Sequence, residues 1–183
     1  MIILIGASAS GKTQIAKQLY KMNYQKCITT TTREKRINEV DGVDYHFLTK
    51  EAFNDLLLSN AFIEVTKYQD NLYGLQRKDI IEQGLVIVDP AGANNLIRSL
   101  GLGVFVVFIK SSKKRRKARM LNRGDQLKSI MSRLKSDDKV FKKKHLIKVD
   151  LVINNKDQPL EQLAQIIHEH YVLFTSKLKK SAN

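Results

Sequence analysis

Eight residues near the start of the chain have the types and the spacing of a phosphate-binding loop, or P-loop. They are Gly6, Ala7, Ser8, Ala9, Ser10, Gly11, Lys12 and Thr13. In such a loop the backbone N–H groups surround a phosphate at the positive end of the following helix. The lysine reaches the β- and γ-phosphates, and the hydroxyl after it coordinates magnesium. The pattern therefore predicts that residues 6–13 bind ATP, with Lys12 as a catalytic cation and Thr13 as a ligand of Mg²⁺.

A carboxylate follows a second apolar run further along the chain. Asp89 comes directly after residues 85–88, which are Leu, Val, Ile and Val. P-loop folds place a carboxylate at the end of a neighbouring strand to hold magnesium or its water shell. We therefore expect Asp89 to contribute to the Mg²⁺ site. The alternative is an aspartate that only starts the turn before Pro90.

Two arginines and two tyrosines could bind a second phosphate. Arg33 and Arg36 are three residues apart, and Tyr45 and Tyr73 follow them. Guanidinium groups and phenol hydroxyls can converge on one dianionic phosphate if the chain between them folds around it. As isolated features they would be surface arginines and core tyrosines. Together with the P-loop they indicate a clamp for a nucleoside monophosphate.

The segments around this clamp resemble the signature of guanylate kinases. The matching stretches are residues 30–36 (TTTREKR), 39–47 (EVDGVDYHF), 62–64 (FIE) and 71–74 (NLYG), in the order of the family. The similarity extends from residue 1 to about 171. It implies a kinase that converts GMP and ATP into GDP and ADP. It also implies one domain over residues 1–175, with a subdomain for the nucleoside monophosphate at about 29–83 and a lid at about 115–141.

The same resemblance assigns roles to further residues. Thr29 matches a hydroxyl at the acceptor phosphate, and Asn154 matches a position near adenine. Glu64 matches the carboxylate that accepts hydrogen bonds from N1–H and N2–H₂ of guanine, donors that adenine lacks. In the lid, arginines would contact the ATP phosphates or the migrating group: Arg119, Arg123 and Arg133. An exposed basic helix is the alternative interpretation of the lid.

Two positions depart from the family pattern. Leu75 stands where the family has Ser or Thr, and Ala91 stands where it has a second Asp. A leucine side chain offers guanine no hydrogen bond, and the loss of one such bond costs roughly 1 to 3 kcal/mol. Two alternatives therefore stay open, a catalytically weakened binding module and a kinase for a different nucleoside monophosphate. If a hydroxyl is missing, Leu75→Ser should raise kcat/KM for GMP.

The elements that must position these residues follow from apolar runs. Four runs rich in Val, Ile, Leu and Phe predict buried strands of a parallel sheet: residues 2–5, 85–88, 104–109 and 151–153. Helical patterns lie between them, which indicates an α/β, three-layer P-loop NTPase fold with a central parallel sheet. Residues 29–83 interrupt this alternation as an inserted subdomain, and the charged segment 115–141 is expected to form a helical lid.

Composition limits the partners and the cellular location that we expect for the protein. The 183 residues carry a net charge of +14, which calls for an anionic partner, although runs such as 142–144 are also typical of a solvated face. Basic stretches interleaved with stacking aromatics are absent from the sequence, which argues against nucleic acid as a partner. Cys27 is the single cysteine, and the apolar start is too short for an export signal or a membrane span. We expect a cytoplasmic enzyme without a membrane partner, with a frayed basic tail at 176–183.

Overall fold

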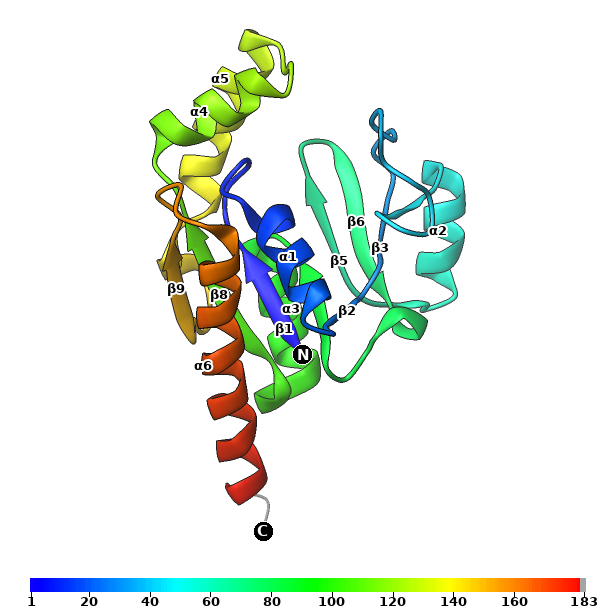
Figure 1. Ribbon diagram of the computed structural model, residues 1–183. Helices are drawn as coiled ribbons and strands as arrows, with labels where there is room; N and C mark the ends of the chain where they lie inside the picture. Colours follow the sequence, from blue (N-terminus) through cyan, green and yellow to red (C-terminus); the bar gives the residue numbers. More distant parts are fainter. Residues whose placement is uncertain (182–183) are drawn as a thin grey trace.

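A computed structural model describes residues 1–181 and contains a five-stranded parallel sheet at its centre (Figure 1). Its strands lie in the spatial order β2, β7, β1, β8, β9. Their bounds are Gln25–Lys26, Gly84–Ile87, Ile2–Ile5, Phe105–Lys110 and Leu151–Asn154. All four neighbouring pairs run parallel, so the four predicted runs are confirmed as strands of one parallel sheet.

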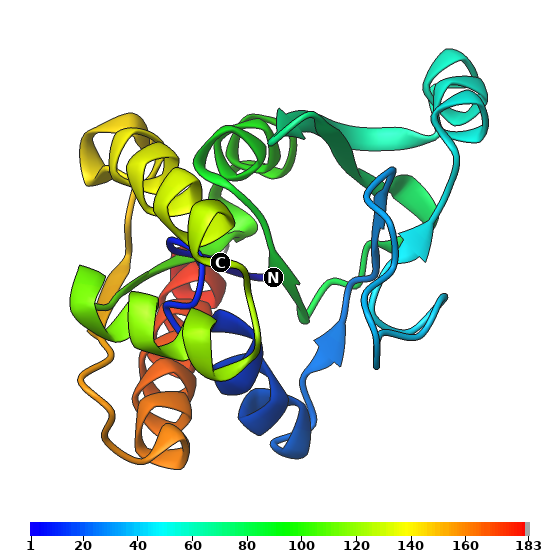
Figure 2. The same ribbon diagram turned by 90° about the horizontal axis from the view of Figure 1, so that it is seen from above.

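Helices cover both faces of this sheet. Alternate residues of a strand point to opposite faces, so Ile2 and Leu4 face one side of the sheet while Ile3 and Ile5 face the other. The first side packs against α1 (Lys12–Lys21) and α6 (Leu160–Ser181), and the second packs against α3 (Pro90–Leu100). Figure 2 shows these helices on opposite sides of the strands. The three-layer α/β prediction is therefore confirmed.

A second, four-stranded sheet is built entirely from the interrupting segment. Its strands lie in the order β4, β3, β6, β5, with bounds His46–Phe47, Thr29–Thr31, Asn71–Gln76 and Phe62–Tyr68. Helix α2 (Lys50–Leu58) accompanies it, and the rings of Phe53 and Phe62 stack with centroids 4.5 Å apart. In the register of this sheet Leu75 lies opposite both Thr29 and Glu64. Three strands thus bring these three residues side by side.

Two helices form the predicted lid as a hairpin beside the P-loop. They are α4 (Lys113–Asn122) and α5 (Leu127–Val140). Met120, Ile130 and Leu134 are buried between them, and Ala9 of the P-loop packs against this cluster. Figure 1 shows the hairpin and the second sheet on opposite sides of the P-loop end of the central sheet. Short 3₁₀ turns at Arg77–Asp79, Gly101–Gly103 and Lys143–His145 complete the described elements.

The last helix corrects one expectation. We expected the chain to fray from residue 176, but α6 continues without a break to Ser181. Tyr171 and Phe174 hold it against the sheet, with ring centroids 5.7 and 5.1 Å from that of Phe105. Residues 182–183 of the expected tail lie outside the described residues. Within residues 1–181, the helices are each too short or too polar to cross a membrane.

Candidate functional site

The P-loop connects the end of β1 to the start of α1. Helix α1 begins at Lys12, as the sequence predicted. Gly6 must lack a side chain because a Cβ atom there would collide with the backbone carbonyl of Ile109, and Gly11 has a φ of 107°. Ala9 adopts a φ of 58°, which is unusual for a residue with a side chain, and it contacts the lid. The loop is therefore tightly constrained and touches α4 and α5 directly.

Lys12 points back over the loop that precedes it. Its Nζ donates hydrogen bonds to the carbonyl oxygens of Gly6, at 2.5 Å, and Ala7, at 3.0 Å. Burial lowers the pKa of Lys12 to about 8, while the nearby carboxylate of Asp137 acts in the opposite direction. A cation that has lost its water is stabilised by an anion brought next to it. The site is thus prepared electrostatically for a phosphate.

One cleft of about 140 Å³ joins the P-loop to the second sheet. Seven of the residues singled out by sequence line it together, although they come from separate parts of the chain: Ser8, Lys12, Thr29, Tyr45, Glu64, Tyr73 and Asp89. The structure therefore brings the predicted phosphate loop, carboxylates and tyrosines into one place.

Glu64 is a buried carboxylate in this cleft. Its residue is 5% exposed, and its Oε2 atom has no hydrogen-bond partner among the described residues. Burial, with a smaller contribution from the negative charge of Asp89, raises the pKa of Glu64 to about 8. Gly92 leaves room for the carboxylate, since a Cβ atom there would lie 2.9 Å from Oε2. A buried acceptor without a partner calls for a ligand that carries N–H donors.

The two arginines of the predicted clamp differ in their surroundings. Arg33 donates from Nη2 to both carboxylate oxygens of Glu39 at 2.9 Å, and its guanidinium carbon lies 5.4 Å from the ring centroid of Tyr45. Nη1 of Arg36 lies 3.8 Å from Oε1 of Glu39. Arg36 also lines an adjoining cleft of about 130 Å³, which Thr13 lines as well. Burial, and then the charge of Arg33, lower the pKa of Arg36. Arg33 is thus held by protein groups, while Arg36 faces the cleft.

Asp89 caps a helix and also lines the cleft, so its Mg²⁺ role stays a prediction. Its Oδ1 accepts a hydrogen bond of 2.9 Å from the N–H of Gly92 and thereby caps α3. Its side chain also lines the main cleft beside Lys12. Within residues 1–181 we find no group of three or more His, Cys, Asp or Glu side chains that could hold a metal by themselves. A single carboxylate and a hydroxyl suit Mg²⁺, which is bound by few protein ligands together with phosphates and water.

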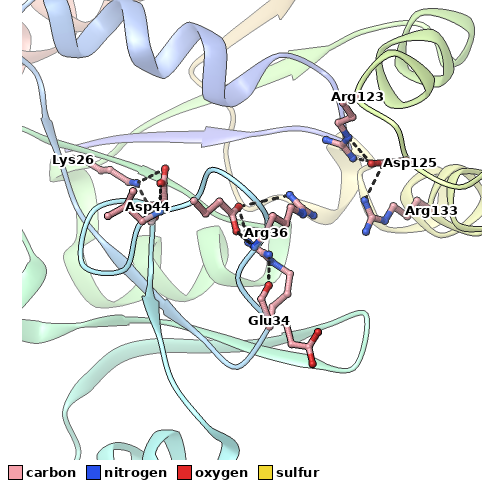
Figure 3. Close-up of polar contacts among 10 residues, drawn as sticks. Lys26, Glu34, Arg36, Asp44, Arg123, Asp125 and Arg133 are labelled. Atoms are coloured by element: carbon pink, nitrogen blue, oxygen red, sulfur yellow. Dashed lines mark hydrogen bonds and ion pairs between the residues drawn. The ribbon is translucent and has the colours of Figure 1, made fainter.

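The lid arginines fall into two groups. Figure 3 shows Arg123 and Arg133 converging on Asp125, with Arg36 facing them from the loop between β3 and β4. The donor–acceptor distances from Arg123 and Arg133 to Oδ2 of Asp125 are 2.6 and 3.3 Å. Hydrogen bonding from Arg123 is the main cause of the lowered pKa of Asp125. Arg119 instead donates to the carbonyl of Ala9 in the P-loop at 3.0 Å. Arg119 therefore contacts the P-loop directly, while Arg123 and Arg133 are held together by Asp125.

At the end of β9 the structure favours the neighbour of the predicted residue. The Asn154 side chain is exposed, whereas Asn155 is 2% exposed and donates from Nδ2 to the carbonyl of Ser10 at 2.9 Å. Its Oδ1 accepts from Arg119 at 2.9 Å, and it lines a cleft of about 270 Å³ with Asp157. Two adjacent asparagines after a strand point to opposite faces, and the sequence alone did not show which one faces the loop.

Comparison with known proteins agrees with this geometry. The guanylate kinase family model matches residues 1–170. Guanylate kinases of Aster yellows witches'-broom phytoplasma and Rickettsia felis are each 33% identical to the chain, covering 86% and 92% of it and 79% and 91% of their own lengths. The crystal structure of guanylate kinase from Anaplasma phagocytophilum gives a TM-score of 0.68 at 25% identity, covering 92% of this chain and 82% of that one. The chain therefore belongs to the guanylate kinase family.

Proposed function

We propose that the protein transfers the γ-phosphoryl group of ATP to GMP, forming ADP and GDP, in the cytoplasm. The observation that carries the proposal is that Lys12 and Glu64 line the same cleft. One is a desolvated cation of the kind that binds nucleotide phosphates, and the other is a buried acceptor without a partner. A kinase needs these two kinds of group within reach of each other, because donor and acceptor nucleotides must meet.

On the donor side, the P-loop and α1 bind the ATP phosphates. The backbone N–H groups of the P-loop that are not bound within the protein, together with the positive end of α1, surround the β-phosphate, and Lys12 neutralises charge on the β- and γ-phosphates. Thr13 and Asp89 would hold Mg²⁺ or its water shell, and the ion would supply charge neutralisation between these phosphates. Asn155, Arg119 and Asp157 line a cleft together with Gly11 of the loop, and they would face the donor nucleoside.

On the acceptor side, the second sheet binds GMP. Arg36, Tyr45 and Tyr73 would hold its phosphate, with Thr29 as a further donor and Arg33 keeping the ring of Tyr45 in place by its stacking contact. The Glu64 carboxylate would accept hydrogen bonds from N1–H and N2–H₂ of guanine. Hydrogen bonds from these two donors stabilise the ionised form of the carboxylate. They therefore offset the effect of burial, which raises the pKa of Glu64.

Catalysis then depends on alignment and charge. The acceptor oxygen belongs to a phosphate that is already ionised at neutral pH, so a strong general base is not required. Arg119, Arg123 and Arg133 would stabilise negative charge on the transferring group as the lid closes over it and excludes water. Asp125 binds Arg123 and Arg133 in the structure. When the nucleotides bind, these two arginines would leave Asp125 and bind the phosphates instead.

Lys12→Ala tests this assignment most simply. We expect ADP formation from ATP and GMP to fall by at least about a hundredfold, because the charge on the β- and γ-phosphates is lost. The variant should keep its circular dichroism spectrum and its melting profile, since the hydrogen bonds of Lys12 go to two loop carbonyls and its only further ring contact among the described residues is with Phe141. A folded Lys12→Ala protein with the turnover of the wild type would remove the P-loop from the mechanism.

A further inference from the structure

Asp137 of α5 is a buried carboxylate that binds three separate parts of the protein. Its residue is 1% exposed. Its Oδ2 accepts hydrogen bonds from the backbone N–H of Ser8 in the P-loop, at 2.8 Å, and from Nη1 of Arg116 in α4, at 3.1 Å. Its Oδ1 accepts from the hydroxyl of Tyr68 at the end of β5, at 2.6 Å. One side chain of the lid therefore holds the donor loop, the first lid helix and the second sheet.

The bond between Arg116 and Asp137 lies inside the protein. Arg116 is 4% exposed, and its other terminal nitrogen donates to the exposed carboxylate of Asp138 at 2.9 Å. A buried ion pair recovers its desolvation cost only in good geometry with further hydrogen bonds. Such a group favours one arrangement of its partners more than it adds stability. The arrangement fixed here is that of the lid on the P-loop.

The anchor and one lid arginine share a face of the same helix. Arg133 and Asp137 are four residues apart in α5, so they lie one turn apart on one side. Figure 3 shows the guanidinium of Arg133 directed from the lid toward Arg36 on the acceptor side. Fixing Asp137 on Ser8 therefore sets where Arg133 is placed relative to both nucleotides.

We propose that Asp137 is a positioning residue for phosphoryl transfer, which seats α5 on the P-loop so that Arg133 faces the migrating group. The inference rests on the proposed function, in which Arg133 contacts that group. Tyr68 extends the same anchor to β5, the strand that carries Glu64. Donor loop, acceptor strand and lid are thus joined through one carboxylate.

Asp137→Asn keeps the size of the side chain and removes its charge, and Asp138→Asn is the matched control. Asp138 binds the same arginine but makes no contact with the P-loop among the interactions of the described residues. We expect Asp137→Asn to lower kcat by about tenfold to a hundredfold, as misplacement of a catalytic group does. The KM values for ATP and GMP should change by less than about threefold, because the contact that is weakened in the end, that of Arg133 with the migrating group, is made in the transition state. Asp138→Asn should stay within about twofold of the wild type.

A double-mutant cycle asks whether Asp137 acts through Arg133. In an Arg133→Ala background, Asp137→Asn should lower kcat by less than about twofold further, because the group that it positions is already absent. Multiplication of the two single effects would overturn the proposal. So would an Asp137→Asn protein whose kcat equals that of Asp138→Asn at a temperature where both are folded.

A paired replacement separates positioning from stability. Arg116→Leu combined with Asp137→Ala removes both buried charges, and such exchanges are often neutral for folding. We expect this protein to fold and to keep the low kcat of Asp137→Asn, since Ser8 and Tyr68 remain without their anchor. If kcat of the paired variant returns to the wild-type value, Asp137 has only a structural role and the inference is overturned. This test can be made even if Asp137→Asn alone does not fold.

The same measurements distinguish the two levels of the account. If the wild type does not phosphorylate GMP, the proposed function fails and the inference fails with it. If the wild type phosphorylates GMP but Arg133→Ala leaves kcat unchanged, the role given to Arg133 fails, and with it the inference about Asp137. If both behave as proposed while Asp137→Asn matches Asp138→Asn, only the inference about Asp137 is wrong.

Discussion

Glu64 shows at the scale of one residue how binding and stability oppose each other. The carboxylate is buried, has an oxygen without a partner and lies near the like charge of Asp89. Its pKa is raised to about 8, well above the ordinary value of 4.5. The folded protein therefore binds this proton more tightly than the unfolded chain does. The stability that comes from the proton is complete below pH 4.5 and is lost as the pH rises toward 8.

Glu64→Gln should therefore stabilise the protein in the absence of nucleotides while it weakens GMP binding. The melting temperature of the variant should exceed that of the wild type by a margin that grows between pH 5 and pH 8, because glutamine does not ionise. The affinity for GMP should fall by at least about tenfold, since the NH₂ group of the glutamine would face the N1–H and N2–H₂ groups of guanine, and two donors cannot form a hydrogen bond with each other. Calorimetric melting and GMP titration, with exposed Glu161→Gln as the control, measure both effects. A margin that does not change with pH would contradict the buried, raised pKa.

The site could be predicted where a local pattern carries the chemistry. The P-loop residues, Asp89, Glu64 and Tyr45 were predicted because fixed spacing or a family signature marks them. Ser8 and Lys12 of the loop line one cleft together with Asp89, Glu64 and Tyr45. Asn155 and Asp137 were missed. Asn155 was missed because the sequence does not show which of the two adjacent asparagine side chains faces the P-loop. Asp137 stands 129 residues from Ser8, and a contact between a helix and a loop so far apart has no local sequence pattern.

At the scale of elements, strand β6 places Leu75 between the acceptor residues. Leu75 pairs with Thr29 on one side and with Glu64 on the other, and a backbone hydrogen bond from Leu75 reaches the Glu64 carboxylate. The leucine side chain is fully buried and packs with Cys27, Val86 and other core residues. The position that the resemblance matches to a hydroxyl is therefore occupied here by a residue of the core.

Leu75→Ser should lower the free energy of unfolding and add a hydrogen bond to guanine. Loss of the buried side chain should cost about 2 to 4 kcal/mol of unfolding free energy, because a cavity is left and a hydroxyl is buried. At a temperature where the protein is folded, kcat/KM for GMP should rise by about fivefold or more as one hydrogen bond is gained. Leu75→Ala is the matched control, since it leaves a similar cavity without a hydroxyl. If both variants show the same kcat/KM for GMP, the hydroxyl is irrelevant at this position.

Element prediction succeeded where apolar runs are long. The runs at 2–5, 85–88, 104–109 and 151–153 appear as strands within one or two residues, because strands buried on both faces are apolar throughout. The two-residue strands β2 and β4 carry too few side chains for any pattern. The length of α6 was underestimated because its basic end resembles a solvated tail, whereas Tyr171 and Phe174 dock the helix just before it.

At the scale of the whole molecule, the positive charge is concentrated in and around the lid. Residues 110–148 contain sixteen Lys and Arg against three Asp, which is +13 of the total +14. Several of these lysines are exposed on α5, among them Lys128, Lys135 and Lys139. Spaced by seven and four residues, they form a stripe on one side of the helix. A field of this kind attracts anionic nucleotides toward the cleft beneath the lid.

Replacing Lys128, Lys135 and Lys139 together by Gln should slow ATP association. The association rate constant, measured by stopped flow at low ionic strength, should fall by about threefold or more, and the difference should shrink as salt is added. Turnover at saturating substrates should not change, because the stripe does not line the clefts around the P-loop. Replacement of exposed Lys21, Lys50 and Lys78 by Gln removes the same charge away from the lid and is the control. Equal slowing by both triple variants would show that only net charge matters.

The most direct test of the whole account is a coupled assay of ADP release from ATP and Mg²⁺ with each of GMP, AMP, CMP and UMP as acceptor. We expect GMP to have the highest kcat/KM, by at least about a hundredfold over AMP, because AMP leaves the buried Glu64 carboxylate without its two donors. Release of ADP that is fastest with another monophosphate would show that the pocket around Glu64 selects a different base. Absence of ADP release with all four acceptors would contradict the assignment as a kinase.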